Sequence, residues 1–286
     1  MILITGATGN LGSAVVAQLL KTLSPEEFVA TSSNAEGVEK LRAKGLQSRL
    51  ANFSDPLSLN EAFKGIDKLL LISTMDQNRY EQHKNVVDAA KEQGVKQIIY
   101  TGLAIKDIHT SAVKDLMISH FQTEDYIKES GLTYTILRNT MYADALTQIL
   151  GSNALNQDIN LSGGNGKVPY ALRREMGEAT ANLLLQDGHE NNTYNITGSN
   201  SFGYTDLAAA LSNLKRDTIK YNDISEDDLK AFLKQIGFPD FAIYLHSGTI
   251  RDIKMAQYEI ESHTMETLLG RPTASIEDIM EELFQN

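Results

Sequence analysis

The chain has 286 residues, of which 42% are hydrophobic and 22% charged, so it is long enough for one large or two small globular domains. Its formal net charge of −11 argues against nucleic acid as a partner, because phosphate contacts require clustered lysines and arginines. The lack of cysteine excludes disulfides, thiolate metal sites and a cysteine nucleophile, and it fits a reducing cytoplasm.

Strand and helix patterns alternate regularly in the first half of the chain. In order, the predicted elements are strand 1–5, helix 13–23, strand 28–32, helix 34–45, strand 46–53, helix 57–65, strand 67–74, helix 80–94, strand 95–102, helix 119–131 and strand 132–139. This alternation predicts βαβ units and a parallel sheet with helices on both faces. Right-handed crossovers then give an α/β fold of Rossmann type, with a doubly wound sheet.

Beyond residue 140 the pattern becomes less regular. The predicted elements are loops with short strands over 151–175, helix 176–188, strand 193–198, helix 205–214 with Thr205 as its N-cap, strand 218–225 and a mostly helical, acidic remainder over 226–286. We therefore predict a doubly wound domain over 1–150 and a smaller α/β cap over 151–286, with segments that interleave with the first domain.

Three glycines follow the first predicted strand in the stretch LITGATGNLG. Their spacing is shifted by one residue from the G-x-G-x-x-G dinucleotide fingerprint, but the physical roles are the same. Gly6 permits the sharp turn, Gly9 lets the backbone approach a pyrophosphate, and Gly12 lets the helix lie close to the sheet. The N–H groups at the start of that helix would face the phosphates. The stretch therefore predicts a dinucleotide-binding turn.

The end of the second predicted strand, where such folds read the adenosine ribose, carries Ser32, Ser33 and Asn34. NAD-binding proteins usually have an acidic residue there, and NADP-binding proteins tend to carry arginine. Small polar side chains at the start of a helix can bond either a 2′-phosphate or a ribose hydroxyl. We expect all three residues to contact the cofactor, and the preference between NADP and NAD stays open.

Five stretches of the chain resemble those of a known protein family. They are GATGNLG, LLLIST, HKNVVDAAKEQGVKQIIYTG, GLTYTILRNTMY and GGNGKVPYALRREMGEATANLLL. In these stretches the chain resembles the NmrA-like branch of the atypical short-chain dehydrogenase/reductase family and, within it, the bacterial NAD(P)H:quinone oxidoreductases. The resemblance covers most of the chain and is densest before residue 200. It implies a nicotinamide cofactor along the carboxyl edge of the sheet and flavin-free, two-electron hydride transfer to a quinone.

The resemblance also implies positions for the cofactor and the substrate. The implied pyrophosphate contacts are Gly6, Thr8, Gly9, Asn10 and Leu11. The implied cofactor-lining residues after the fourth and fifth strands are Ser73, Thr74, Met75, Thr101 and Gly102. The residues implied at the nicotinamide and the substrate are Asn139, Met141 and Tyr142. One departure weakens the family's NADPH preference here, because Ser33 stands where relatives carry a basic residue.

The Tyr-x-x-x-Lys pair of the wider superfamily, in which the tyrosine donates a proton to a carbonyl, is missing. The predicted helix at 119–131 offers His120 and Glu124 at that spacing, and Tyr126 is followed by Ser130. Carbonyl reduction and sugar epimerisation therefore lack their acid, whereas a quinone accepts hydride and can take its proton from water. His120, with an ordinary pKa of about 6.5, is either the proton donor to the reduced quinone or a structural residue bonded to Glu124.

Aromatic residues in the second half offer walls for a flat substrate. The candidates for an apolar lid are Tyr170, Phe202, Phe238, Phe241 and Tyr244. We expect an NAD(P)H:quinone oxidoreductase whose small-molecule acceptor is held near His120 and Tyr142. The alternatives are a non-catalytic NAD(P)-sensing regulator of the NmrA type and a reductase of another conjugated aromatic compound.

The longest apolar run, at 69–72, is too short to cross a bilayer, and no basic leader precedes the first predicted strand. We therefore expect a cytoplasmic protein with no membrane partner. No two of its six histidines have the spacing of metal ligands, so we expect no metal. The sequence leaves the oligomeric state open, with a homodimer as one alternative.

Overall fold

The computed structural model describes residues 1–151 and 153–285, which group into two compact units. Unit 1 comprises Met1–Leu103, Ile118–Asn139 and Arg173–Tyr194. Unit 2 comprises Ala104–Met117, Thr140–Leu172 and the segment from Asn195 onward.

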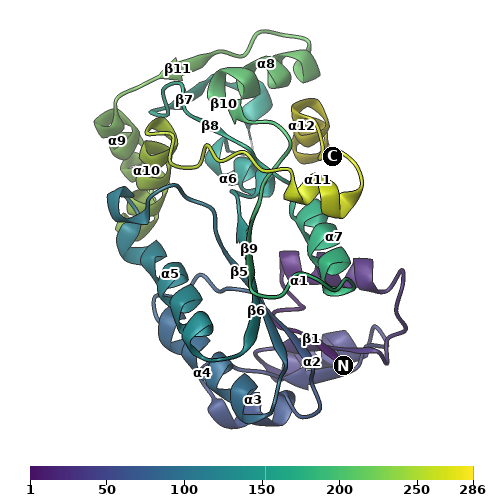
Figure 1. Cartoon of the computed structure of the whole chain (residues 1–286). Coiled ribbons are helices and arrows are strands. Elements are labelled where there is room, and N and C mark those ends of the chain that lie inside the picture. The colour runs from purple at the N-terminus through teal and green to yellow at the C-terminus, as the bar shows by residue number, and fades with distance from the viewer. Residues whose placement is uncertain (152, 286) are drawn as a thin grey trace. The chain divides into compact units, whose positions relative to one another are not determined.

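A seven-stranded sheet in the order β3-β2-β1-β4-β5-β6-β9 forms the centre of unit 1 (Figure 1). Its strands are β1 (Ile2–Ile4), β2 (Phe28–Ser32), β3 (Ser48–Leu50), β4 (Lys68–Leu71), β5 (Gln97–Leu103), β6 (Thr133–Asn139) and β9 (Asn192–Ile196), the last of which ends in unit 2. β1 pairs in parallel with both β2 and β4. The strand order therefore reverses between β1 and β4, and the predicted Rossmann-type, doubly wound sheet is confirmed.

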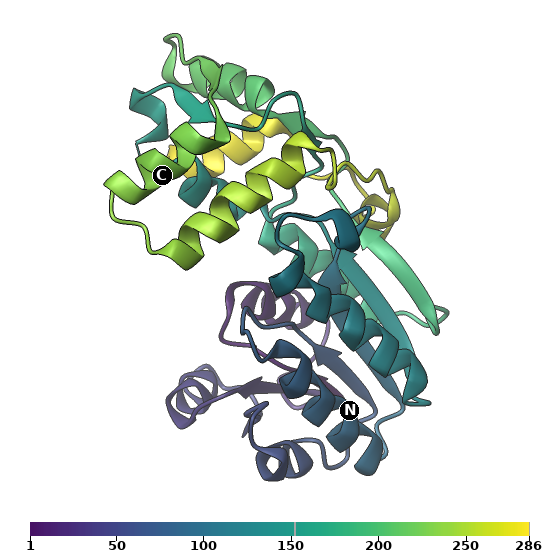
Figure 2. The ribbon, with the colours of Figure 1, turned by 90° about the vertical axis from the view of Figure 1, so that its left-hand side faces the viewer.

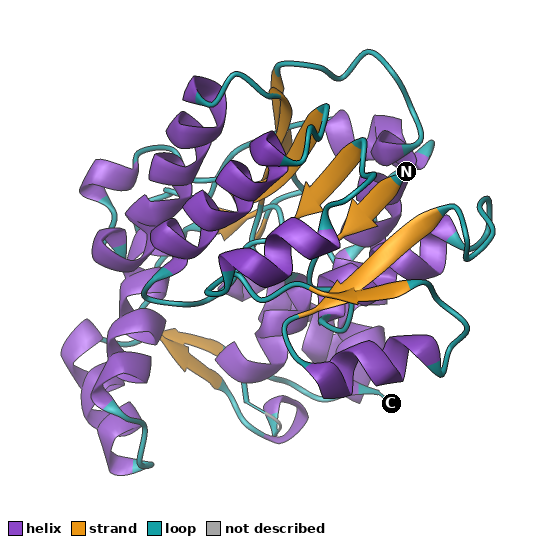
Figure 3. Ribbon diagram, turned by 90° about the horizontal axis from the view of Figure 1, so that it is seen from below, coloured by secondary structure: helices purple, strands orange, loops and turns teal. Residues whose placement is uncertain are grey.

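Helices cover both faces of this sheet, whose strands are orange in Figure 3. They are α1 (Asn10–Leu19), α2 (Ala35–Arg42), α3 (Pro56–Ala62), α4 (Arg79–Glu92), α5 (Lys114–Glu129) and α7 (Arg173–Leu184). α1 and α7 lie on one side, and α3, α4 and α5 lie on the other (Figure 1). Figure 2 shows α5, in teal, running beside the long strands.

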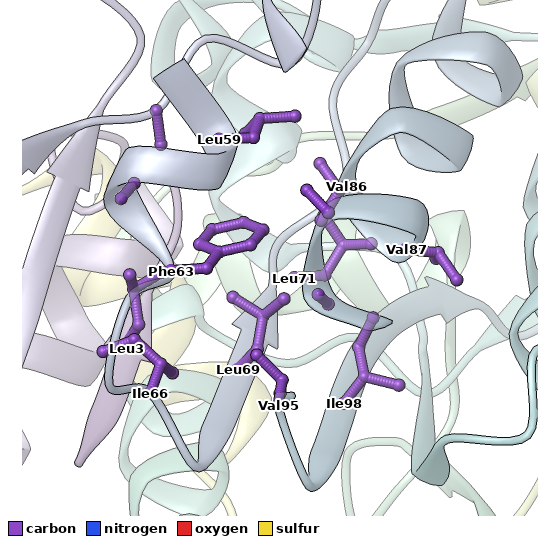
Figure 4. Packing of buried hydrophobic residues seen from close by; sticks show 14 of the residues in the cluster. Leu3, Leu59, Phe63, Ile66, Leu69, Leu71, Val86, Val87, Val95 and Ile98 are labelled. Atoms are coloured by element: carbon purple, nitrogen blue, oxygen red, sulfur yellow. The ribbon is translucent and has the colours of Figure 1, made fainter. Parts of the chain in front are cut away.

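The core of unit 1 lies where α3 and α4 pack on the central strands (Figure 4). Leu3, Leu69 and Ile98 from neighbouring strands and Val86 from α4 are fully buried. Strands of a parallel sheet covered on both faces are mostly apolar, so short apolar runs in the sequence indicated where the central strands lie.

Unit 1 does not end at a single point in the chain, because residues 173–194 return to it. α7 packs so closely on α1 that a Cβ on Gly177 would lie 2.5 Å from the Cβ of Ala14. β9 takes the edge position beside β6. Residues 104–117 and 140–150, before the predicted boundary, group with unit 2.

Unit 2 is the smaller α/β part of the fold. Its elements include α6 (Leu146–Ile149), β7 (Ile159–Leu161), β8 (Lys167–Val168), β10 (Phe202–Gly203), α8 (Tyr204–Lys215), β11 (Tyr221–Asp223), α9 (Glu226–Gln235), α10 (Asp240–Lys254), α11 (Thr264–Leu269) and α12 (Ile276–Phe284). β8 pairs with β10 and β7 with β11. Thr205 is not the N-cap of α8: the cap is Gly203, whose N–H donates to the Asp206 carboxylate at 2.9 Å.

Among the described residues, no helix combines the length and the apolar character needed to cross a membrane.

Candidate functional site

The turn from β1 into α1 has the geometry of a phosphate cradle. Gly6 has a φ of +59°, and its carbonyl accepts a hydrogen bond from the Gly9 N–H at 2.9 Å. A Cβ on Gly12 would lie only 2.2 Å from the Gly6 oxygen, so α1 can lie this close only with glycine there. Of the residues expected at the pyrophosphate, Thr8 and Asn10 are exposed with the two glycines, whereas the Leu11 side chain is buried. Leu11 can therefore serve a ligand only through its backbone.

Hydrogen bonds join the residues that follow β1 and β4 to each other and to the carboxyl end of β5. The Ile72 N–H donates to the Thr5 hydroxyl at 2.9 Å, and the Ser73 N–H donates to the Thr101 hydroxyl at 3.0 Å. Ligands of doubly wound sheets bind at the carboxyl ends of the strands where the strand order reverses, here between β1 and β4. The residues expected to line the cofactor after β4 and at the end of β5 therefore lie at this edge of the sheet, where Met75 is 63% exposed and Thr101 is buried.

The last residue of β2, Ser32, and the two residues after it differ in how their side chains could contact the ribose. Ser32 is buried, and a Cβ on Gly37 would lie 2.0 Å from its hydroxyl oxygen. The Asn34 side chain caps α2 by accepting the Gly37 N–H at 2.8 Å. Ser33 and Asn34 are both exposed, so the Ser33 hydroxyl and the amide N–H₂ of Asn34 are the side-chain groups that can reach the ribose.

Arg79 holds the loop after β4, a role that the sequence analysis missed. Its guanidinium is fully buried and donates to the Thr74 carbonyl at 2.5 Å, to the Ser119 hydroxyl at 2.8 Å and toward the Met75 sulfur at 3.3 Å. It thereby ties two residues expected to line the cofactor to α5. The sequence contains an indication of this role. A positive charge at the first position of a helix interacts unfavourably with the helix dipole, so another interaction must favour an arginine there.

His120 is buried in unit 1, and its Nδ1 lies 2.8 Å from the Tyr100 hydroxyl. Burial, the nearby Arg79 charge and His83 hold its pKa well below the ordinary value, so the ring is neutral. The alternative in which His120 bonds Glu124 is wrong. Glu124 is buried and paired with Arg138 through bonds of 2.9 and 2.6 Å.

His83 is a second buried histidine, and its Nδ1 lies 3.0 Å from the Thr123 hydroxyl. That hydroxyl donates to the Ser119 carbonyl, so it accepts the His83 Nδ1–H. Burial, followed by the Arg79 charge, lowers the pKa of His83 to about 3.

We expect the unfolding free energy to decrease as the pH falls below about 6.5, where histidines of the unfolded chain take up protons and folded His83 does not. The loss should be about 1.4 kcal/mol per pH unit for each buried neutral histidine, and His83 stops contributing near its folded pKa of about 3. Urea titrations at several pH values measure this slope. His83→Gln should reduce this slope, and a slope equal to that of the wild-type protein would contradict the assignment.

The other expected substrate-side residues divide between the units. Asn139, at the end of β6, belongs to unit 1 and is buried. Met141 and Tyr142 belong to unit 2 and are half-buried, and Tyr142 forms an isolated bridge with Ala171. Among the lid candidates, Tyr170 is not a wall residue, because it is 2% exposed and lies in the core of unit 2.

A family model described as NAD(P)H-binding matches residues 6–169, which span the glycine turn and strands β4, β5 and β6. The chain belongs to this NAD(P)H-binding family. It is 35% identical to quinone oxidoreductase 2 of Escherichia coli (strain K12), with 99% of each chain covered. The crystal structure of an NADPH-dependent quinone oxidoreductase from Escherichia coli complexed with NADPH matches with a TM-score of 0.92 at 34% identity and covers 99% of this chain and all of that one.

A second solved structure, of triphenylmethane reductase from Citrobacter sp., also matches with a TM-score of 0.92, at 31% identity, and covers all of this chain and 99% of that one. The resemblance inferred from the motifs is thereby confirmed. Within residues 1–151 and 153–285, no group of three or more histidine or acidic side chains is arranged to hold a metal ion.

Proposed function

We propose that the chain is a flavin-free NAD(P)H-dependent quinone oxidoreductase. The observation that carries the proposal is similarity over the whole length, 35% identity with 99% of each chain covered, to a protein that is itself a quinone oxidoreductase. The glycine turn fits the cofactor, because it packs too closely on α1 for a Cβ at Gly12 and leads directly into the start of a helix, whose first N–H groups can bind a pyrophosphate.

The residue roles that we propose are those that the family resemblance implies. Gly6, Thr8, Gly9, Asn10 and the Leu11 backbone would bind the pyrophosphate. Ser73, Thr74, Met75, Thr101, Gly102, Asn139 and Met141 would line the nicotinamide side, and Ser32, Ser33 and Asn34 the adenosine side. The quinone would lie near His120 and Tyr142.

The cofactor supplies a hydride, and the chain's residues orient the acceptor and deliver a proton. Tyr-x-x-x-Lys is missing, and the residue at the tyrosine position is a buried, neutral His120. A quinone suits this site because its carbonyl need not be protonated before hydride transfer.

Loss of NADH or NADPH absorbance with benzoquinones and naphthoquinones tests the function. We expect turnover with at least one quinone. We expect every dye or enone to be a poorer substrate than that quinone. Faster turnover of triphenylmethane or azo dyes would identify a reductase of other conjugated aromatics. Tight cofactor binding with no turnover of any acceptor would identify a sensing regulator and overturn the proposal.

Ser33 should control the preference between the two cofactors. Ser33→Arg should tighten NADPH about tenfold with little effect on NADH, because one charge-assisted bond to the 2′-phosphate adds about 1.5 kcal/mol. Ser33→Asp should weaken NADPH by repulsion and leave NADH nearly unchanged. Titration calorimetry measures both, and an equal response of the two cofactors would place the 2′-phosphate elsewhere.

The proposal extends to a cytoplasmic protein that acts on a small molecule without nucleic acid or a membrane, supported by the net charge of −11 and the lack of cysteine. Fractionation of cells tests the location. Light scattering at several concentrations, with and without NADPH, tests the homodimer.

A further inference from the structure

A cluster of buried polar side chains lies between β5, α4 and α5 in unit 1, beside the loop that follows β4. Its members are Arg79, His83, Tyr100, Ser119, His120 and Thr123, each at most 8% exposed. Arg79 and Thr123 bond Ser119, and Tyr100 bonds His120. Hydride transfer does not require this cluster, so another use must explain why so many polar groups are buried together.

The Tyr100–His120 pair has the arrangement of a proton donor and its acceptor. The Tyr100 oxygen lies 2.8 Å from His120 Nδ1, and the Arg79 guanidinium interacts electrostatically with Tyr100. A cation beside a phenol makes its O–H a stronger donor and stabilises the phenolate. With Tyr100 as the donor to Nδ1, the neutral His120 ring carries its own proton on Nε2.

The position of His120 follows from the direction of α5. Glu124, one turn later, places Oε1 3.1 Å from where a Cβ on Gly102 would be, so α5 passes the carboxyl end of β5. α5 connects two parallel strands and runs opposite to them, so His120 lies about 6 Å further toward the carboxyl edge of the sheet. Its neighbour Ser119 is tied through Arg79 to the Thr74 carbonyl of the loop after β4.

We infer that Tyr100 and His120 form a proton relay to the reduced quinone, with Arg79 stabilising the tyrosinate. The inference rests on the proposed function. After hydride transfer the acceptor is a hydroquinone monoanion. The His120 Nε2–H bond breaks and its proton goes to the hydroquinone oxygen, while the Tyr100 O–H bond breaks and its proton goes to Nδ1. When the product leaves, a proton from water returns to Nε2, and the Nδ1 proton returns to Tyr100.

The charges around His120 require a relay rather than a charged donor. The groups that face it are Arg79, His83 and Tyr100, and the first two oppose an imidazolium. Neutral His120 can release its Nε2 proton only if it receives another at Nδ1. A hydroquinone is itself a phenol, so its acidity lies in the range of tyrosine, whose ordinary pKa is about 10. The transfer exchanges one phenolate for another, and the positive charge of Arg79 stabilises the tyrosinate.

NMR of the histidine ring nitrogens tests the protonation state of His120 without quinone or cofactor. We expect His120 in the form protonated at Nε2, with Nδ1 as the acceptor, and a changed Nδ1 shift in Tyr100→Phe. Protonation at Nδ1 in the wild-type protein would overturn the relay. This measurement stands whether or not the protein reduces quinones.

Kinetics tests the proton transfer from Tyr100, with Tyr126→Phe as the matched control. Each variant removes one tyrosine hydroxyl from unit 1, but that of Tyr126 bonds Asp88, outside the cluster. We expect Tyr100→Phe to lower quinone turnover at least about tenfold, within the range of general acid catalysis, with NADPH affinity unchanged. Added imidazole buffer should restore its rate, because a small acid can replace the relay.

A Tyr100→Phe rate equal to that of Tyr126→Phe and independent of buffer would overturn the relay. Failure of the wild-type protein to reduce any quinone would instead overturn the proposed function. Thermal unfolding of both variants verifies that the remaining phenyl ring, which packs edge-on against His83, keeps the core intact.

Discussion

Gly12→Ala is expected to damage both folding and cofactor binding. The new Cβ would lie 2.2 Å from the Gly6 oxygen and 2.9 Å from the Ala7 Cα, so the turn or α1 must move. Overpacking of this kind costs about 1–3 kcal/mol of unfolding free energy. The shift also misplaces the N–H groups at the start of α1, and NADPH affinity should fall about tenfold to a hundredfold, since each lost hydrogen bond is worth about 1 kcal/mol.

Gly9→Ala is the matched variant in the same turn. Its Cβ would lie 3.3 Å from the Gly6 oxygen, and its φ of −81° and ψ of 171° suit any residue. We expect the unfolding free energy to change by less than about 0.5 kcal/mol, while NADPH affinity falls because the methyl group stands where the pyrophosphate approaches. Urea unfolding and titration calorimetry separate the two effects. Wild-type affinity in both variants would exclude this turn as the cofactor site.

The parts of the fold that could be predicted from the sequence depend on local signals. Buried parallel strands such as β4 appear as short apolar runs, and the glycine turn is complete within seven residues, so the Rossmann-type core was predicted correctly. Strand ends were less well predicted: β3 covers only Ser48–Leu50 of the predicted 46–53. A strand of three residues is too short to show the alternation of apolar and polar side chains from which a strand is predicted.

The contacts that could not be predicted join residues far apart in the chain. The spacing of His120 and Glu124 suggested that they bond each other, yet Glu124 pairs with Arg138 and His120 with Tyr100. On one helix, neighbouring positions are evident from spacing, but partners on other strands become visible only when the sheet order is known. The return of α7 and β9 to unit 1 depends in the same way on packing against α1 and pairing beside β6.

Arg79→Met is expected to separate cofactor binding from stability. The change removes a buried cation whose desolvation is unfavourable, which lowers the pKa of Arg79, and it leaves the Thr74 carbonyl and the Ser119 hydroxyl without this donor. These effects oppose each other, so the unfolding free energy should fall by no more than about 2 kcal/mol. The loop after β4 loses its tie to α5, however, and must be ordered when the cofactor binds.

We therefore expect NADPH affinity to fall at least about tenfold in Arg79→Met, because ordering several loop residues on binding costs more than 1.4 kcal/mol. Lys91→Met removes an exposed positive charge from the same helix and should leave affinity unchanged. Removal of the Arg79 charge should also raise the pKa of His83 from its value of about 3, which NMR titration measures. An unchanged affinity together with a raised histidine pKa would mean that Arg79 acts on the buried cluster alone, and that the loop is held by Thr5 and Thr101 without it.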